Sequence, residues 1–358
     1  MKGPEAPVRL AASSSEARSA SPSPPTSPSS AGTAPSPASP AASLLERLQS
    51  VIGDTVIGYS GAIEALTIAL STDGHVLLEG LPGLAKTYLV REFARALDLT
   101  YRRIQFTPDM LPLDIVGNVI LNAKTQQFEF RPGPVFSNVL LADEINRAPP
   151  KVQSALLEAM QEFQVTVDGR TYPLPRPFLV IATQNPLDQE GTFPLPESQL
   201  DRFMFRYVLQ YPPRDVEIRI LATQAVDPGH NVPGHVVTQE QIGVLRASHQ
   251  GVFLHPDVLA YIADIVRETR NDTRIQVGAS PRAGVHLMLA ARALAFLDGR
   301  HYVLPDDVRS AVFAVLNHRI VLRPDAKRAR TPTSPAPGPE GLLREVIDSV
   351  VDRVRAPR

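Results

Sequence analysis

A glycine-bearing loop that ends in Lys-Thr constrains this chain more than any other feature. The loop consists of Glu79, Gly80, Leu81, Pro82, Gly83, Leu84, Ala85, Lys86 and Thr87. It follows the apolar run 76–78, which predicts a buried strand, and precedes 88–97, which predicts a helix. Such a loop binds phosphate, because its backbone N–H groups and the positive end of the following helix face the anion. Lys86 is expected to reach the β- and γ-phosphates of a nucleotide, and the Thr87 hydroxyl to ligate Mg²⁺.

The loop departs from the common pattern at Ala85, where a glycine usually precedes the lysine. We expect alanine to be tolerated, because this position should open the helix, where right-handed backbone accommodates a Cβ. Gly80 and Gly83 keep the positions at which close backbone approach is most needed. The alternative interpretation is an ordinary glycine turn before a helix, which the motifs described below make less favourable.

Composition limits the classes of protein to which the chain can belong. Its 358 residues suggest two or so folded units plus tails, and a hydrophobic content of 43% supports a substantial core. With 36 basic and 37 acidic residues it lacks the strongly basic footprint of a nucleic-acid binder. The absence of cysteine excludes disulfides, thiolate zinc sites and a cysteine nucleophile. Without a signal-peptide core or an apolar run near the ~20 residues of a membrane span, we expect a cytoplasmic protein.

The composition changes along the chain in a way that predicts its domains. Residues 1–42 are dominated by Ser, Pro, Ala and Thr, so we expect a disordered tail, with a tether or proline-rich ligand as the alternative. In 43–212 apolar strand-like runs alternate with helical patterns, which predicts an α/β domain with a parallel sheet. Residues 213–237 are expected to form a linker, and 238–355 an all-helical domain in which no strand is predicted.

Local signals refine both domains. Segment 116–121 with 127–130, and 163–167 with 171–174, predict two β-hairpins. Helix starts in the second domain are predicted by a capping box at Thr238 and by prolines that would occupy the first helical position. These prolines are Pro256, Pro281 and Pro305, and Pro150 gives the same signal in the first domain.

Two further strand ends carry residues suited to nucleotide chemistry. Asp143 and Glu144 directly follow the apolar run 139–142, at the edge of the sheet where α/β folds bind ligands. Asp143 is expected to hold Mg²⁺, and Glu144 to orient and deprotonate an attacking water. Asn185 ends the next predicted strand and could position the same water near the γ-phosphate; the alternative is a turn residue ahead of proline.

Two arginines outside these strands complete the candidate set. Arg202 lies in the segment 199–203, and Arg282 stands near the predicted start of a helix at Pro281. A guanidinium suits an oxygen-rich group on which negative charge develops. Each arginine alone would more often be a surface salt-bridge partner.

Taken together, these motifs resemble the MoxR-type AAA+ ATPases, in the helix-2-insert clade. The resemblance runs from about residue 44 to 354 and is specific, because several long motifs occur in order. The matching segments are 80–87, 141–150, 154–162, 182–186, 195–203 and 278–283.

The resemblance implies an α/β P-loop AAA+ core with a parallel sheet, followed by an all-helical lid, with ATP and Mg²⁺ bound between the two. It implies that 80–87 is Walker A and that Asp143 and Glu144 form Walker B. It also implies that Asn185 is sensor 1 and that Arg282 is sensor 2, which reaches the γ-phosphate from the lid.

Other implications concern the assembly. Subunits of this family form rings, typically hexamers, and Arg202 matches the arginine finger offered to a neighbouring site. Arg147 is a second inter-subunit candidate. The hairpins near Asn122 and Asp168 match insertions that face the working surface of the ring. Relatives act as chaperone-like ATPases that assemble complexes or insert metal cofactors, often with von Willebrand factor A domain partners.

Two other functions remain alternatives at this point. A DNA- or RNA-translocating motor would share these insertions, but the near-zero net charge weighs against it. A nucleotide-gated scaffold with little turnover is disfavoured by the intact Glu144 and Asn185.

Overall fold

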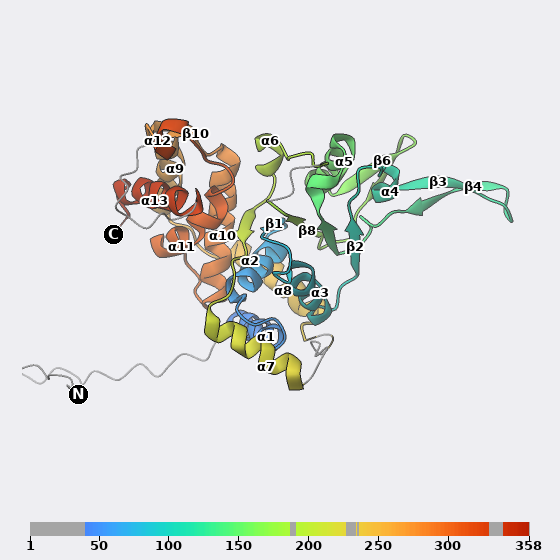
Figure 1. The fold of residues 1–358 in the computed structure, drawn as a ribbon, viewed down its shortest axis with the longest axis horizontal. Coiled ribbons are helices and arrows are strands. Elements are labelled where there is room, and N and C mark those ends of the chain that lie inside the picture. Colours follow the sequence, from blue (N-terminus) through green and yellow to red (C-terminus); the bar gives the residue numbers. More distant parts are fainter. Residues whose placement is uncertain (1–39, 187–190, 227–233, 235, 329–338, 358) are drawn as a thin grey trace, which may run out of the picture. The chain divides into compact units, whose positions relative to one another are not determined.

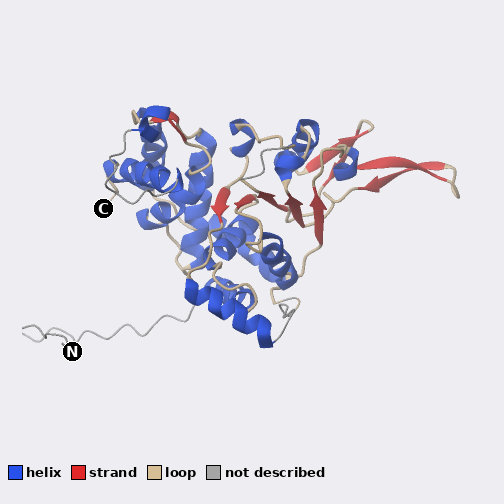
Figure 2. Ribbon diagram, in the orientation of Figure 1, coloured by secondary structure: helices blue, strands red, loops and turns tan. Residues whose placement is uncertain are grey.

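A five-stranded parallel sheet, in the order β2-β5-β8-β1-β9, forms the centre of the computed structural model (Figures 1 and 2). Its strands are β1 (Val76–Glu79), β2 (Tyr101–Gln105), β5 (Val139–Asp143), β8 (Leu179–Gln184) and β9 (Phe205–Val208). The prediction of a parallel α/β sheet is confirmed. The edge strands β2 and β9 were not predicted, because their side chains are partly exposed and lack a continuous apolar run.

The structure describes residues 40–186, 191–226, 234, 236–328 and 339–357. The disorder predicted for the tail therefore falls almost wholly outside the described residues. Its predicted boundary is wrong at one point, because helix α1 (Pro40–Gly53) begins inside the segment 1–42. The apolar face of α1, which includes the buried Leu44 and Leu48, extends the fold to this point.

Helices cover both faces of the sheet and divide the apolar residues into two clusters. On one face lie α1, α2 (Ser60–Ser71) and α3 (Lys86–Ala96); on the other lies α5 (Pro150–Glu162). Alternate residues of β1 point to opposite faces, so Val76 and Leu78 join the first cluster and Leu77 joins the second. The short helices of this region are α4 (Leu113–Val116), η1 (Ile145–Arg147) and α6 (Glu197–Leu200).

Both predicted hairpins are present. Strand β3 (Gly117–Asn122) pairs with β4 (Gln127–Pro132), and β6 (Gln164–Val167) pairs with β7 (Arg170–Pro173). The second hairpin turns at Asp168 and Gly169, with φ of 49° and 73°, the positive values that a two-residue turn requires. Figure 1 shows the β3–β4 hairpin reaching well beyond the edge of the sheet.

The C-terminal region is helical, as predicted, and its predicted helix starts are confirmed. Thr238 forms the expected capping box, and Pro256, Pro281 and Pro305 each begin a helix. The helices are α8 (Gln239–Ser248), η2 (His249–Gly251), α9 (Pro256–Asn271), α10 (Pro281–Leu297), α11 (Pro305–Leu316), α12 (Pro324–Arg328) and α13 (Pro339–Arg353).

The expectation that no strand follows residue 212 is wrong in one place. Strands β10 (Ile275–Val277) and β11 (Val321–Leu322) form a small antiparallel pair. Segments this short show no periodicity, and their pairing depends on the packing of the helices between them. The segment expected to be a linker contains helix α7 (Arg214–Val226).

The lid helices share an apolar cluster with the first face of the sheet. Helix α10 contacts α1 and α2, and α11 contacts β9. The described residues from Pro40 onward accordingly belong to one compact unit. The division into 43–212 and 238–355 therefore stays a prediction.

Candidate active site

A cavity of about 450 Å³ lies at the carboxyl ends of β1, β5 and β8. It brings together the loop residues 82–87 with Asp143, Glu144 and Asn185, all of which the sequence analysis singled out. The strand order explains this convergence. Strand β8 lies between β1 and β5, so the three loops that follow these strands meet at one edge of the sheet.

Thr87 and Asp143 meet across the cavity although 56 residues separate them in the sequence. The Thr87 hydroxyl donates to Oδ2 of the buried Asp143 at 3.1 Å. A hydroxyl and a carboxylate are the hard oxygen ligands that Mg²⁺ prefers, and Mg²⁺ is commonly bound through one or two protein ligands plus substrate phosphates. These two residues therefore fit the magnesium role predicted for them.

Thr183 fixes the two acidic residues, and sequence reasoning missed it. Its hydroxyl donates to Oδ1 of Asp143 and accepts a hydrogen bond from the backbone N–H of Glu144 at 2.9 Å. The residue lies on β8, in the strand that pairs with β5. Its position, two residues before Asn185 at a strand end, was the signal that could have found it.

The phosphate loop corrects one prediction. Ala85 has φ of 55° and ψ of 24°, so it is left-handed and caps α3, which begins only at Lys86. The expected right-handed backbone at Ala85 is wrong, because the loop must reverse its curvature before the helix starts. Left-handed backbone costs a residue with a Cβ roughly 1–2 kcal/mol. The Lys86 ammonium donates to the carbonyl oxygens of Gly80 and Leu81, within the curve of the loop.

Glu144 also has left-handed backbone, with φ of 59°. Non-glycine residues in this region cluster at functional sites, where the surrounding structure holds them. The Glu144 carboxylate pairs with Arg147 at 3.2 Å and accepts a weak hydrogen bond from Gln105 at 3.4 Å. Arg147 thus contacts its own chain's acid here, and its predicted inter-subunit role stays a prediction.

Arg103, on the edge strand β2, is a second residue that the sequence did not reveal. Its guanidinium lines the cavity and donates to Oδ2 of Asp143 at 2.8 and 3.1 Å. The pairing of β2 with β5 places it there, and β2 itself was not predicted. Arg103 therefore competes for the carboxylate oxygen that a metal ion would use.

A second cavity, of about 560 Å³, adjoins the loop at Gly83 and Leu84. Its other walls are largely apolar and come from the segment before α2, from the chain after β9 and from α7. They include Val56, Ile57, Tyr59, Tyr211, Ile220 and Leu221. An apolar cavity next to a phosphate loop is suited to a nucleobase, and no motif identified these residues in advance.

The two predicted arginines lie elsewhere. Arg282 lies 3.7 Å from Oδ2 of Asp201. Arg202 lies near Arg282: burial, and then the positive charge of Arg282, lower the pKa of Arg202. Among the described residues, those that line the 450 Å³ cavity all belong to 82–185. Arg282 therefore lies beside Arg202 in this structure, and its sensor 2 role stays a prediction.

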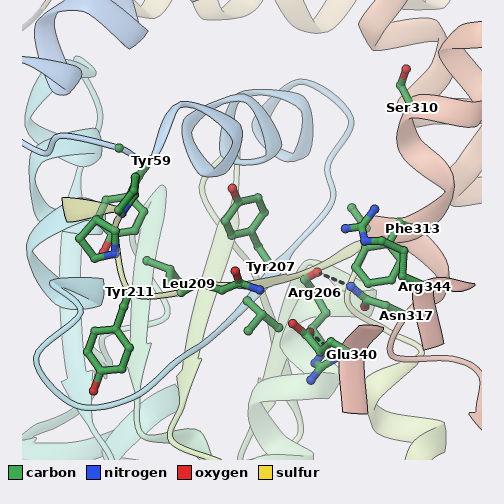
Figure 3. Close-up of a pocket in the computed structure, with 16 residues that line it drawn as sticks. Tyr59, Arg206, Tyr207, Leu209, Tyr211, Ser310, Phe313, Asn317, Glu340 and Arg344 are labelled. Carbon is green, nitrogen blue, oxygen red and sulfur yellow. Dashed lines mark hydrogen bonds and ion pairs between the residues drawn. The ribbon is translucent and has the colours of Figure 1, made fainter. Parts of the chain in front are cut away.

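Figure 3 shows a pocket where β9 of the core meets α11 and α13 of the lid. Arg206, on β9, pairs with Glu79 at 2.6 Å and lies 3.7 Å from Glu340 of α13. Asn317, after α11, donates to the Arg206 carbonyl at 3.0 Å. Glu79 directly precedes Gly80, so an ion-paired arginine connects the start of the phosphate loop to two lid elements.

Comparison with known proteins matches both regions of the chain. A family model described as "ATPase family associated with various cellular activities (AAA)" matches residues 75–205, and one described as "AAA lid domain" matches 267–337. No helix among the described residues is long and apolar enough to cross a membrane.

Individual relatives extend the match to most of the chain. The Chaperone MoxR1 of Mycobacterium tuberculosis is 42% identical over 86% of this chain and 81% of its own length. The Protein MoxR of Methylorubrum extorquens is 33% identical over 85% of this chain and 94% of its own. The crystal structure of a putative ATPase from Cytophaga hutchinsonii superposes with a TM-score of 0.78 at 40% identity, covering 89% of this chain and 96% of that one.

Proposed function

Because this chain belongs to the MoxR-type AAA+ ATPase family and is therefore an ATPase, we propose that it binds and hydrolyses Mg²⁺-ATP in the 450 Å³ cavity. The observation that carries this assignment is the 3.1 Å hydrogen bond between Thr87 and Asp143, in a cavity shared with Lys86, Glu144 and Asn185.

Each residue of the cavity has a distinct task in this proposal. Backbone N–H groups of the loop 80–87 donate to the phosphates, and Lys86 exchanges loop carbonyls for phosphate oxygens. Thr87 and Asp143 would hold Mg²⁺, which when bound neutralises charge on the β- and γ-phosphate oxygens. Glu144 accepts a proton from the attacking water, and Asn185 positions that water.

The arginines act on a neighbouring subunit in this proposal. Arg202 and Arg282 lie side by side, away from the cavity of their own chain, so both are assigned to the nucleotide of the next protomer. The charge that develops on the transferring phosphoryl group is the partner they would stabilise. A ring, which we take to be a hexamer, presents these arginines to every site.

The proposed cellular role is chaperone-like remodelling or maturation of protein complexes, including insertion of metal cofactors. It is supported by the chaperone name of one relative and by exposed apolar side chains on the β3–β4 hairpin, where Phe128 is 77% and Leu121 53% exposed. Such side chains suit contact with a protein client. A von Willebrand factor A domain partner and a cytoplasmic location stay predictions of the sequence analysis.

Two substitutions test the site. Lys86→Ala should abolish nucleotide binding, because the phosphates lose their cation, whereas Glu144→Gln should bind ATP and lose turnover, because an amide cannot accept the proton. Binding is measured with a fluorescent ATP analogue and turnover by phosphate release. Equal turnover by Glu144→Gln and wild type, in protein free of contaminating ATPase, would overturn the assignment of Glu144.

A mixing experiment tests the action across subunits. Arg202→Ala should bind ATP almost normally and hydrolyse it poorly, since arginine fingers contribute about 10³–10⁵ in rate in other phosphoryl-transfer systems. Mixed with Lys86→Ala, which retains its arginine, the Arg202→Ala chain should regain activity. Mixed rings that are shown to form and yet stay inactive would contradict action across subunits.

The nucleic-acid motor and the scaffold make different predictions. A motor should bind single strands with strong salt dependence, and a scaffold should show no turnover above the Glu144→Gln background. Either result would replace the proposed remodelling function.

A further inference from the structure

We propose that Arg319 positions Arg202 and Arg282 for the neighbouring subunit's nucleotide. This role rests on the proposed action of both arginines across the interface. Arg319 follows α11 in the lid region and has no part in the cavity that holds Lys86 and Glu144.

Arg319 holds the backbone on both sides of Arg202. Only 6% of Arg319 is exposed, which is exceptional for an arginine. Its Nη2 donates to the carbonyl oxygens of Asp201 at 3.0 Å and Phe203 at 2.5 Å, and its Nη1 donates to that of Met204 at 3.2 Å. The planar fork of a guanidinium thus fixes the backbone on both sides of Arg202, whose own side chain is half-buried.

The Asp201 side chain connects the same fork to Arg282. Its Oδ1 accepts from Nε of Arg319 at 2.8 Å, and Oδ2 lies 3.7 Å from Arg282. The hydroxyl of Ser280, which caps α10, donates to both oxygens at 2.9 and 3.0 Å. One carboxylate therefore joins Arg319, the start of α10 and Arg282.

The balance of charge leaves room for an anion from outside. Arg282 and Arg319 both pair with Asp201, and Arg202 lies near Arg282 and the Glu158 carboxylate, so three arginines face two carboxylates. Burial lowers the pKa of Arg319 to about 10, which still leaves it charged at neutral pH. Desolvation of both charges offsets much of the stability gained from a buried ion pair. Fixed geometry beside a phosphoryl group, in contrast, raises the rate of phosphoryl transfer.

The contact with His286 agrees with this arrangement. Nη2 of Arg319 also lies 2.6 Å from Nδ1 of His286. Burial, followed by the charges of Arg319 and Arg282, lowers the pKa of His286 to about 3, so the ring stays neutral. His286 lies on α10, so the fork of Arg319 also contacts the helix that carries Arg282.

The test uses the pair of inactive chains, Lys86→Ala and Arg202→Ala, in which the first lends its arginines and the second hydrolyses ATP. Arg319→Lys keeps the charge and loses the fork. When Arg319→Lys is combined with Lys86→Ala in one chain and mixed with Arg202→Ala, the restored activity should fall about 100-fold, because a misplacement of about 1 Å can have that effect. When Arg319→Lys is instead combined with Arg202→Ala and mixed with Lys86→Ala, the restored activity should not change, because the Arg202→Ala chain contributes only its phosphate loop.

A second variant guards against loss of folding. Asp201→Asn keeps an acceptor for Arg319 and removes the charge that unites the cluster, and it should show the same asymmetry. Size-exclusion chromatography verifies mixed rings, and ATP-analogue binding by each single variant should match wild type. Equal loss in both arrangements, no loss in either, or weaker ATP binding would overturn the positioning role. An inactive parent mixture would instead overturn action across subunits, and with it this inference.

Discussion

His75 should make the stability of this protein depend strongly on pH. The ring is buried just before β1, where Nδ1 accepts from the backbone N–H of Val180 at 3.1 Å and Nε2 lies 3.0 Å from the Met160 carbonyl oxygen. Only a neutral ring with its proton on Nε2 satisfies both groups. Protonation at Nδ1 would set two N–H donors against each other.

The magnitude follows from the shift in affinity for the proton. Burial lowers the pKa of His75 from 6.5 to about 4. Between pH 6.5 and 4 the His75 ring is protonated in the unfolded chain and neutral in the folded chain. The contribution of His75 to the free energy of unfolding is therefore fully present above pH 6.5 and is lost as pH falls toward 4. At 1.36 kcal/mol per pKa unit, the loss is about 2 kcal/mol between pH 7.5 and 5, and about 3 kcal/mol in full.

The assay is urea unfolding followed by circular dichroism at pH 7.5 and pH 5. His75→Gln keeps a donor for Met160 and cannot titrate; it should be less stable at pH 7.5 by about 1–3 kcal/mol, because Val180 N–H loses its acceptor. Its further loss of stability between the two pH values should be smaller than that of wild type by about 2 kcal/mol.

The exposed His301 provides the matched control. His301→Gln should retain the pH dependence of wild type. If His75→Gln also retains that dependence, the reasoning from burial and hydrogen bonding at His75 is refuted.

Two predictions concern the nucleotide cavity. Ala85→Gly should stabilise the protein by up to about 1.5 kcal/mol. Relief of left-handed backbone contributes about 1–2 kcal/mol, and the entropic cost of glycine is about 0.5–1 kcal/mol. A lower melting temperature would contradict this. Arg103→Gln should lower the Mg²⁺ concentration needed for half-maximal ATP-analogue binding by up to about fivefold. The Arg103 side of its ion pair with the buried Asp143 is 43% exposed, so solvent screening limits the pair to about 1 kcal/mol, and its loss frees Asp143. An increased Mg²⁺ requirement would show that Arg103 assists binding.

Much of the cavity could be predicted because its residues follow buried strands. Lys86, Asp143 and Asn185 each lie close after an apolar run, and the carboxyl ends of parallel strands must meet at one edge. The residues that were missed lack such a signal. Arg103 lies on a strand whose residues are mostly exposed, and Thr183 reads as one more β-branched residue of a strand.

The sequence by itself determined the chemistry of the phosphate loop, the alternation of strands and helices, both hairpins and most helix starts in the lid. These depend on residues close together in the chain, whose spacing, caps and turns act locally. Tertiary structure alone decided the left-handed backbone of Ala85, the pairing of β10 with β11 and the pairing of Arg282 and Arg319 with Asp201, beside Arg202. That cluster joins segments up to 118 residues apart, and only the packing of the lid on the core brings them together.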